Sequence, residues 1–207
     1  MPLTKYTQRV VPTLWTTPQV SSATCYKYSL GSATYICGMQ DSSPKKRRGV
    51  FVDVQNVFST TRHFAPNSRI NYQALIEYFN ESPDYQTTFT AFSSFDPERE
   101  EQRRFIMALA LMGYRVITKP LKRLPSGEIK ANMDMEIAME ILETSRYLDE
   151  VVIVSGDGDF VALVNRLVLR GKIVRVVGPD QFSAPELIQA CHEFVSLSRI
   201  PGMLEDI

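Results

Sequence analysis

The sequence predicts an α/β domain: a central, mainly parallel β-sheet with helices on both faces, that is, a three-layer α/β/α sandwich. Two observations predict it. From residue 49 onward, short apolar runs typical of buried strands alternate with segments of helical period. Hydrophobic residues make up 44% of the 207 residues, which suits one domain with a sizeable core. Because right-handed crossovers join parallel strands, we expect the strands to end at a common edge.

The expected strands are short and apolar, and they span residues 49–54, 86–92, 114–119, 150–154, 172–177 and 194–197. The expected helices carry apolar residues on one side, and they span residues 70–80, 96–112, 133–146, 160–170 and 185–191. The strongest helix start is Asp96-Pro97-Glu98, where a capping residue precedes proline and an acid. Gly113 and Gly171 are expected to end their helices. A basic loop or hairpin with a Pro-Ser-Gly turn is expected over residues 121–130.

Residues 1–48 differ from the rest of the chain. They are rich in Thr, Ser and Tyr, lack a sustained period, and end in four basic residues. We expect an N-terminal extension that is flexible or loosely packed. Met39 lies just before the expected domain, and a start codon misassigned upstream would give the same pattern. The domain itself is expected over residues 49–200, with a C-terminal tail at 201–207.

Charge and cysteine content exclude several classes of protein. The 23 basic and 23 acidic residues cancel, so any nucleic-acid surface has to come from local clustering. Three cysteines without a CxxC pair, and only two histidines, argue against a zinc site or a disulfide framework. Neither a membrane-length apolar run nor a signal-peptide core is present. We therefore expect a cytoplasmic protein with no membrane association.

Four aspartates are expected at the carboxyl edge of the sheet. Asp53 ends the first strand, and Asp157 and Asp159 directly follow the strand 150–154. If these two strands are neighbours, Asp53 and Asp157 face one another where ligands bind in such sheets. Asp134 begins a helix on its inward side, where a charge needs a cation or a partner.

Each of these aspartates alone could cap a helix or favour the helix dipole. Together they are costly, because carboxylates about 5 Å apart repel by about 3 kcal/mol per pair at an effective dielectric constant near 20. A divalent cation would offset this repulsion. Oxygen-only ligands suit Mg²⁺ or Mn²⁺, so we expect one of these ions here.

Three motifs resemble those of the NYN domain, a group of PIN-like ribonucleases, and in particular its LabA-like branch. They are FVDVQN at 51–56, KANMDMEIAME at 130–140 and VVIVSGDGDF at 151–160. The resemblance covers about residues 49–178 and implies a PIN-like Rossmannoid α/β/α sandwich with metal-dependent RNA cleavage. The metal-site carboxylates that it implies are Asp53, Asp134, Asp157 and Asp159, with Asn56 beside them. The sequence departs from the family at Ala131, commonly Gly, and at Glu140, commonly Asp, which leaves the role of Glu140 open.

We therefore expect a metal-dependent endoribonuclease that hydrolyses RNA phosphodiester bonds. One alternative is a non-catalytic RNA-binding or regulatory protein on the same fold, since fold alone does not determine function. A further alternative is a metal-dependent phosphatase, although Gln55 stands where a dehalogenase-type phosphatase needs a second aspartate. A dinucleotide site at Gly156-Asp157-Gly158 is disfavoured, because the aspartates there would repel phosphate.

A basic cluster precedes Asp134 in the sequence, and it is predicted to bind the RNA backbone. It consists of Lys119, Lys122, Arg123 and Lys130. Single-stranded RNA is the expected ligand, because a flexible strand can enter a narrow acidic cleft and a duplex cannot. The alternative is a solvated basic hairpin. A homo-oligomer is left open.

Overall fold

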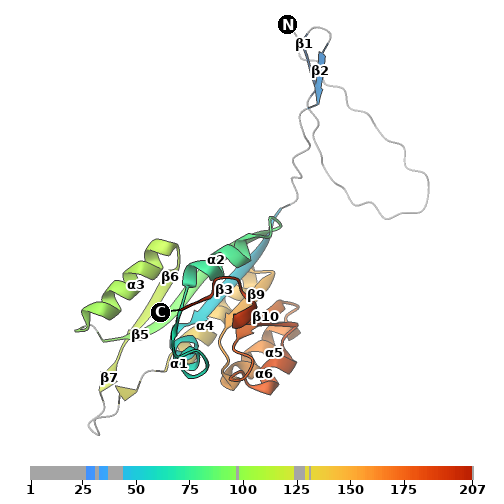
Figure 1. The fold of residues 1–207 in the computed structure, drawn as a ribbon. Helices are drawn as coiled ribbons and strands as arrows, with labels where there is room; N and C mark the ends of the chain where they lie inside the picture. The colour runs from blue at the N-terminus through green and yellow to red at the C-terminus, as the bar shows by residue number, and fades with distance from the viewer. Residues whose placement is uncertain are drawn as a thin grey trace. The chain divides into compact units, whose positions relative to one another are not determined.

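The structure is a computed structural model that describes residues 27–30, 33–36, 44–96, 98–123, 129–130 and 132–206. The chain divides into two units, Met1–Pro44 and Lys45–Ile207. In the first unit, β1 (Lys27–Leu30) and β2 (Ala33–Ile36) pair antiparallel (Figure 1). Most of the expected extension lies outside the described residues, so its character stays a prediction.

The second unit is built on a six-stranded sheet in which all neighbouring strands run parallel (Figure 1). The strand order is β11-β10-β9-β3-β5-β6. The strands are β3 (Lys46–Asp53), β5 (Tyr85–Phe95), β6 (Arg115–Pro120), β9 (Glu150–Val154), β10 (Ile173–Gly178) and β11 (Glu193–Ser196). The expected parallel α/β sheet is therefore confirmed.

Helices cover both faces of this sheet, as the sequence predicts. Helices α1 (Val54–Phe64), α2 (Tyr72–Asn80) and α3 (Glu100–Met112) pack on one face. Helices α4 (Asp134–Thr144), α5 (Val161–Leu169) and α6 (Pro185–Ala190) pack on the other. Short 3-10 turns span Ser145–Tyr147, Gly158–Phe160 and Leu197–Arg199. Strand β3 contributes side chains to the core on both faces of the sheet. Val50 and Val52 pack against the first set of helices, and Phe51 packs against the second.

Strand β3 begins at Lys46, three residues before the strand expected from the sequence. Arg48 lies inside the domain with only 3% of its surface exposed. Its Nε is 2.9 Å from Oε1 of the fully buried Glu150, and its Nη1 donates to the carbonyl oxygen of Phe79. This basic residue was expected at the end of the extension, because its buried acidic partner is 102 residues away in the sequence.

Two helices on the first face differ from the prediction. Residues 54–64 were not expected to be helical, but Asp53 caps α1 by accepting the backbone N–H of Asn56 over 3.0 Å. The helix expected from residue 96 begins at Glu100 instead. Asp96 accepts the N–H of Glu98 in a turn before that helix. The helix ends at Gly113 in the left-handed conformation, as expected.

Two small antiparallel pairs complete the described fold. Strand β12 (Leu204–Asp206) pairs with β4 (Ser68–Ile70), so three residues of the segment expected as a tail form a strand of the domain. Strands β7 (Lys122–Arg123) and β8 (Ile129–Lys130) form the hairpin expected over residues 121–130. Within the described parts of the chain, every helix is too short or too polar to cross a lipid bilayer.

Candidate metal centre

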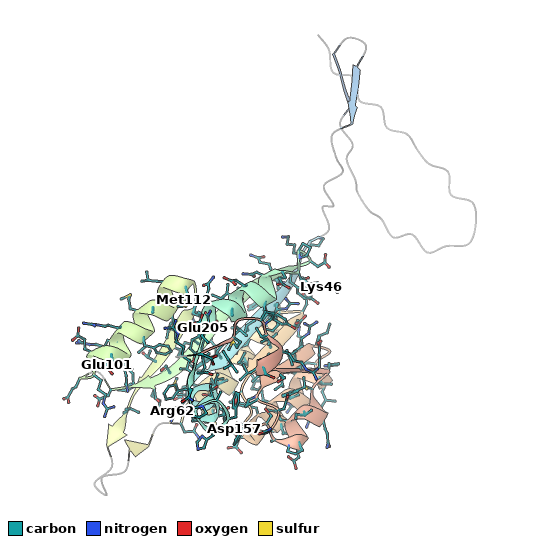
Figure 2. The ribbon with its side chains drawn as sticks, in the orientation of Figure 1. Lys46, Arg62, Glu101, Met112, Asp157 and Glu205 are labelled. Carbon is teal, nitrogen blue, oxygen red and sulfur yellow. The ribbon has the colours of Figure 1, made fainter. Side chains whose placement is uncertain are left out.

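The order of the strands reverses between β3 and β9. The chain runs from β3 outward to β5 and β6, and then returns to β9 on the other side of β3. Ligands bind in such sheets beyond the carboxyl ends of the strands at this reversal. The register pairs Val52 with Val154, so β3 and β9 are neighbours, which was the condition for Asp53 and Asp157 to lie at the same place. Lys46, at the start of β3, and Asp157 lie at opposite ends of the sheet (Figure 2).

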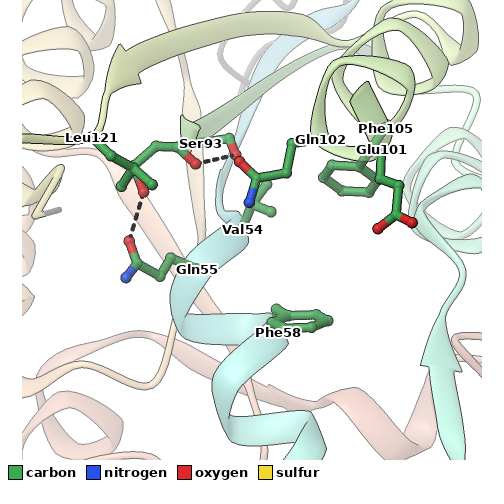
Figure 3. A pocket seen from close by; sticks show the side chains of 9 residues that line it. Val54, Gln55, Phe58, Ser93, Glu101, Gln102, Phe105 and Leu121 are labelled. Atoms are coloured by element: carbon green, nitrogen blue, oxygen red, sulfur yellow. Dashed lines mark hydrogen bonds between the residues drawn. The ribbon is translucent and has the colours of Figure 1, made fainter. Parts of the chain in front are cut away.

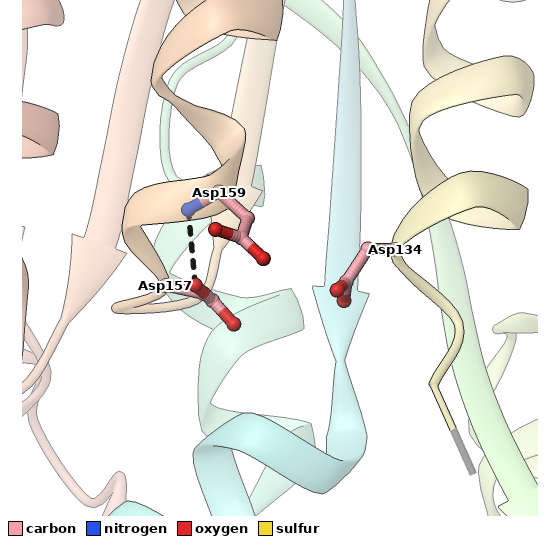
Figure 4. A group of neighbouring side chains, drawn as sticks. All are labelled: Asp134, Asp157 and Asp159. Carbon is pink, nitrogen blue, oxygen red and sulfur yellow. Dashed lines mark hydrogen bonds between the residues drawn. The ribbon is translucent and has the colours of Figure 1, made fainter.

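Three aspartates point toward one another at this position (Figure 4). Each of Asp134, Asp157 and Asp159 has a carboxylate oxygen within 4.8 Å of the others. Asp134 comes from the start of α4, and the other two come from the loop and 3-10 turn after β9. Within the described residues, the structure thus brings together three of the four predicted carboxylates as a compact group.

Local hydrogen bonds fix the loop that carries two of these aspartates. Asp157 caps the 3-10 turn, and its Oδ1 accepts the N–H of Asp159 over 3.0 Å. The N–H of Asp157 donates to Oγ of Ser155, which is completely buried. Gly156 donates its N–H to Oδ1 of Asn56 over 3.0 Å. Asn56 therefore anchors the loop to α1 through its side chain.

Asp53, the fourth predicted carboxylate, lies beside the group and is nearly buried, with 8% of its surface exposed. Its Oδ2 lies 3.5 Å from Oγ of Ser155, which donates to it. Burial raises the pKa of Asp53 from 3.8 to about 6, against the opposing hydrogen bond from Asn56. The negative charges of Asp134 and Asp157 raise this pKa further. Asp53 therefore belongs to the same electrostatic site as the clustered aspartates.

Asp134 is placed by the turn that precedes α4. Its N–H donates to Oδ1 of Asn132 over 2.7 Å. Partial burial raises the pKa of Asp134, and a side-chain hydrogen bond with Asn132 opposes the shift. The charges of Asp157, Asp159 and Glu136 add to the rise. Asn132 was not among the residues predicted for the site, although an asparagine two residues before a helix start is typical of a side-chain turn.

The three carboxylates fit a small divalent cation. Mg²⁺ binds oxygen at about 2.0–2.1 Å, so its octahedral ligands lie about 3 to 4 Å from one another. Oxygens within 4.8 Å need only small side-chain rotations to reach this spacing. No described lysine or arginine forms an ion pair with Asp134, Asp157 or Asp159. This concentration of acceptor oxygens without a protein cation suits Mg²⁺ or Mn²⁺.

Neighbouring charges on α4 have protein partners of their own. Glu140, whose role the sequence left open, forms an ion pair with Arg115 of β6. It stands outside the three-aspartate group. Lys119 donates to Oε1 of Glu136 over 2.6 Å and to the carbonyl oxygen of Asn132 over 3.2 Å. The hydrogen bond from Lys119 lowers the pKa of Glu136.

Of the predicted RNA-binding cluster, the structure describes only the side chain of Lys119. It braces the segment before α4 rather than standing free. The side chains of Lys122, Arg123 and Lys130 lie outside the described residues, although their backbones form the hairpin of β7 and β8. Their contact with RNA therefore stays a prediction.

A hollow of about 460 Å³ opens beside the first turns of α1 (Figure 3). It lies between α1, the end of β5 and α3. Its walls come from segments that are distant in the sequence, so no local sequence pattern indicates it. The lining residues are Val54, Gln55, Phe58, Ser93, Ser94, Glu101, Gln102, Phe105 and Leu121.

An α/β/α sandwich with aspartates at the carboxyl edge of a parallel sheet is the arrangement of PIN-like proteins. Residues 47–198 match the family model of the NYN domain. The chain belongs to the NYN domain family, as the three sequence motifs predicted.

Two proteins similar to this chain extend the comparison. The low amplitude and bright protein LabA of Synechococcus elongatus is 29% identical over 169 residues, which cover 77% of this chain and 88% of that protein. The crystal structure of a protein of unknown function from Vibrio parahaemolyticus has a similar fold, with a TM-score of 0.70 and 29% identity. That similarity covers 80% of this chain and all of the other. The LabA-like relationship is therefore confirmed.

Proposed function

We propose that this chain is a metal-dependent endoribonuclease that hydrolyses phosphodiester bonds of single-stranded RNA in the cytoplasm. NYN domains are in general ribonucleases, and the match covers most of the chain. The observation that carries the proposal is the group of three carboxylate oxygens within 4.8 Å of one another at the reversal of strand order. A divalent cation held by these carboxylates would stabilise the negative charge that builds up on a phosphate during hydrolysis.

We assign Asp134, Asp157 and Asp159 as ligands of Mg²⁺ or Mn²⁺, and Asp53 as the fourth carboxylate of the site. The bound ion would lower the pKa of a water molecule and compensate charge on the phosphodiester. In the metal-free chain, burial raises the pKa of Asp53 to about 6. A bound cation would favour the charged form of Asp53, which suits a group that accepts a proton from water. Asn56 is a positioning residue, because it holds the loop of Asp157 through Gly156.

We further propose that the hairpin of β7 and β8 guides the RNA backbone to this site. Its residues Lys122, Arg123 and Lys130 lie close in sequence to Asp134, and β6 ends at the same edge of the sheet as β3. Positive charge there would offset the repulsion between an acidic pocket and a polyanion. Lys119 contributes by holding the start of α4 in place.

The test is a cleavage assay with the full chain on end-labelled single-stranded RNA, with Mn²⁺, with Mg²⁺ and with a chelator. We expect internal cleavage products with either ion and none with the chelator. Asp157→Asn should lower the rate by about 100-fold or more, because a charged ligand is lost. Asp180→Asn, which changes an exposed aspartate outside the site, is the matched control.

The same assay separates the alternatives. RNA that is bound but stays intact with both ions would favour a non-catalytic regulator. Hydrolysis of a small phosphate ester without cleavage of RNA would favour a phosphatase. Either result would overturn the ribonuclease assignment.

A further inference from the structure

We propose that the hollow beside α1 binds one nucleobase of the RNA strand, stacked between Phe58 and Phe105. The inference rests on the proposed function for its ligand, RNA, and adds a base-binding site to the metal centre. The hollow has a volume of about 460 Å³, which suits one base with its ribose better than a folded protein element.

The two aromatic rings come from different helices and lie on opposite sides of the hollow (Figure 3). Phe58 of α1 is 54% exposed and Phe105 of α3 is 37% exposed, so both leave apolar ring surface in water. The ring of Phe105 is held from its other side by an edge contact with the buried Tyr72, with 5.6 Å between the ring centroids. Exposed aromatic rings held in this way are typical stacking surfaces for the bases of single strands.

Two side-chain amides supply hydrogen-bond donors to the same hollow. Oε1 of Gln55 accepts from the hydroxyl of Ser94 over 3.0 Å. Oε1 of Gln102 accepts from the backbone N–H of Asp96 over 2.7 Å. Among the described residues, neither amide nitrogen has a hydrogen-bond partner. Their NH₂ groups are therefore available to the carbonyl oxygens and ring nitrogens of a base.

A positive charge lies beside one of the two rings. The guanidinium carbon of Arg62 is 5.5 Å from the centroid of the Phe58 ring. Arg62 is exposed, and it makes no ion pair with a carboxylate in the described part of the chain. A base stacked on Phe58 would bring its own phosphate close to this charge, which favours a nucleotide over a neutral aromatic ligand.

The hollow and the metal centre share the first turn of α1. Gln55 is the second residue of this helix, and its cap is Asp53. We therefore expect the phosphodiesters next to a base in the hollow to lie toward Asp53, the cap of this helix. The base site would fix which phosphodiester of the strand meets the aspartates.

The experiment measures the Kd of the full chain for end-labelled single-stranded RNA by fluorescence anisotropy, with Ca²⁺ in place of Mg²⁺ and with intact RNA verified on a gel. Phe58→Ala and Phe105→Ala are each expected to weaken binding by roughly 10-fold or more, in line with the loss of one stacked base. Met107→Ala is the matched control, because Met107 is an exposed apolar residue of α3 that does not line the hollow. Its Kd should stay unchanged, and the melting temperatures of all variants are compared with the native chain.

A second set of RNAs carries an abasic ribose at one position at a time. The native chain should bind one of these RNAs, with the abasic ribose at a particular position, more weakly than the intact strand. The two phenylalanine variants should bind that abasic RNA and the intact strand with equal Kd. Equal Kd values for native chain and phenylalanine variants, or equal losses at every abasic position, would overturn the base site while RNA cleavage with Mn²⁺ stands. Phenylalanine-dependent binding without cleavage would retain the base site and remove the ribonuclease assignment. No binding by the native chain would overturn both.

Discussion

The side chain of Asn56 accepts a 3.0 Å hydrogen bond from the backbone N–H of Gly156, and this bond joins α1 to the loop after β9 across 100 residues of sequence. Since that loop carries Asp157 and Asp159, Asn56 determines where two of the three clustered carboxylates lie. A side chain at position 156 would bring a Cβ within 2.8 Å of the carbonyl oxygen of Phe182, so only glycine fits there.

The first prediction concerns this anchor. Asn56→Ala should weaken Mn²⁺ binding by about 10- to 100-fold, the range typical for loss of a group that orients a metal ligand. The aspartates themselves remain, so binding should be weakened and not abolished. Isothermal titration with Mn²⁺ measures this. Asn165→Ala, at an exposed position of α5, is the control, and an equal affinity for both variants would contradict the anchoring role.

The second prediction concerns repulsion between the clustered carboxylates. Asp157→Asn should raise the melting temperature by a few degrees in chelator, because one negative charge is removed from the group. The hydrogen bond that Oδ1 accepts from Asp159 is retained by the amide. The same variant should lose the stabilisation by Mn²⁺ that the native chain shows. A native chain that melts at the same temperature with and without millimolar Mn²⁺ would count against the metal site.

The third prediction follows from the raised pKa of Asp53. Its folded-state pKa of about 6 exceeds the ordinary value of 3.8, so the folded chain binds this proton more tightly than the unfolded chain. The stabilising contribution is present below about pH 4 and is lost as the pH rises to about 6. In chelator, Asp53→Asn should therefore be more stable than the native chain at neutral pH, on the order of 2 to 3 kcal/mol, and equally stable near pH 4. Denaturant titrations at several pH values test this, and a pH-independent difference would refute it.

The fourth prediction concerns the buried ion pair at the other end of the sheet. Glu150→Gln leaves the guanidinium of Arg48 buried without its counter-charge, so unfolding should become easier by about 3 to 5 kcal/mol. The control is Glu100→Gln, which breaks an exposed pair with Arg104 and should cost about 0.5 kcal/mol or less. Urea unfolding compares the two. Similar losses for both variants would show that burial adds little to this pair.

The fifth prediction concerns the basic hairpin. The double change Lys122→Ala with Arg123→Ala should weaken binding to single-stranded RNAs of unrelated sequence and flatten the salt dependence of affinity. Each lost phosphate contact reduces the slope of log K against log salt by about 0.7. Mn²⁺ binding should stay intact, because neither residue is an assigned ligand. Unchanged affinity and slope would remove the hairpin from the RNA path.

Local signals were sufficient to predict most elements of the fold. The strand at residues 150–154 was predicted to the residue, because an apolar run between polar residues describes a strand that is buried on both faces. Helix α1 was missed although its buried residues Val54, Val57 and Thr61 follow a helical spacing. Its start depends on the cap by Asp53, a residue that the sequence indicated only as the end of a strand. The pairing of β12 with β4 was missed as well, because it joins segments more than 130 residues apart.

The order of amino acids is enough to identify which residue types stand at the carboxyl ends of the strands, and from these the four aspartates and the family. The arrangement of these aspartates follows from the folded chain: Asp134, Asp157 and Asp159 form one compact group, and Asp53 lies buried beside it. The tertiary structure also created the hollow between α1 and α3. The physical reason is that strand and helix periods are local properties of the chain, whereas burial, pKa and the distance between two side chains depend on which strands become neighbours.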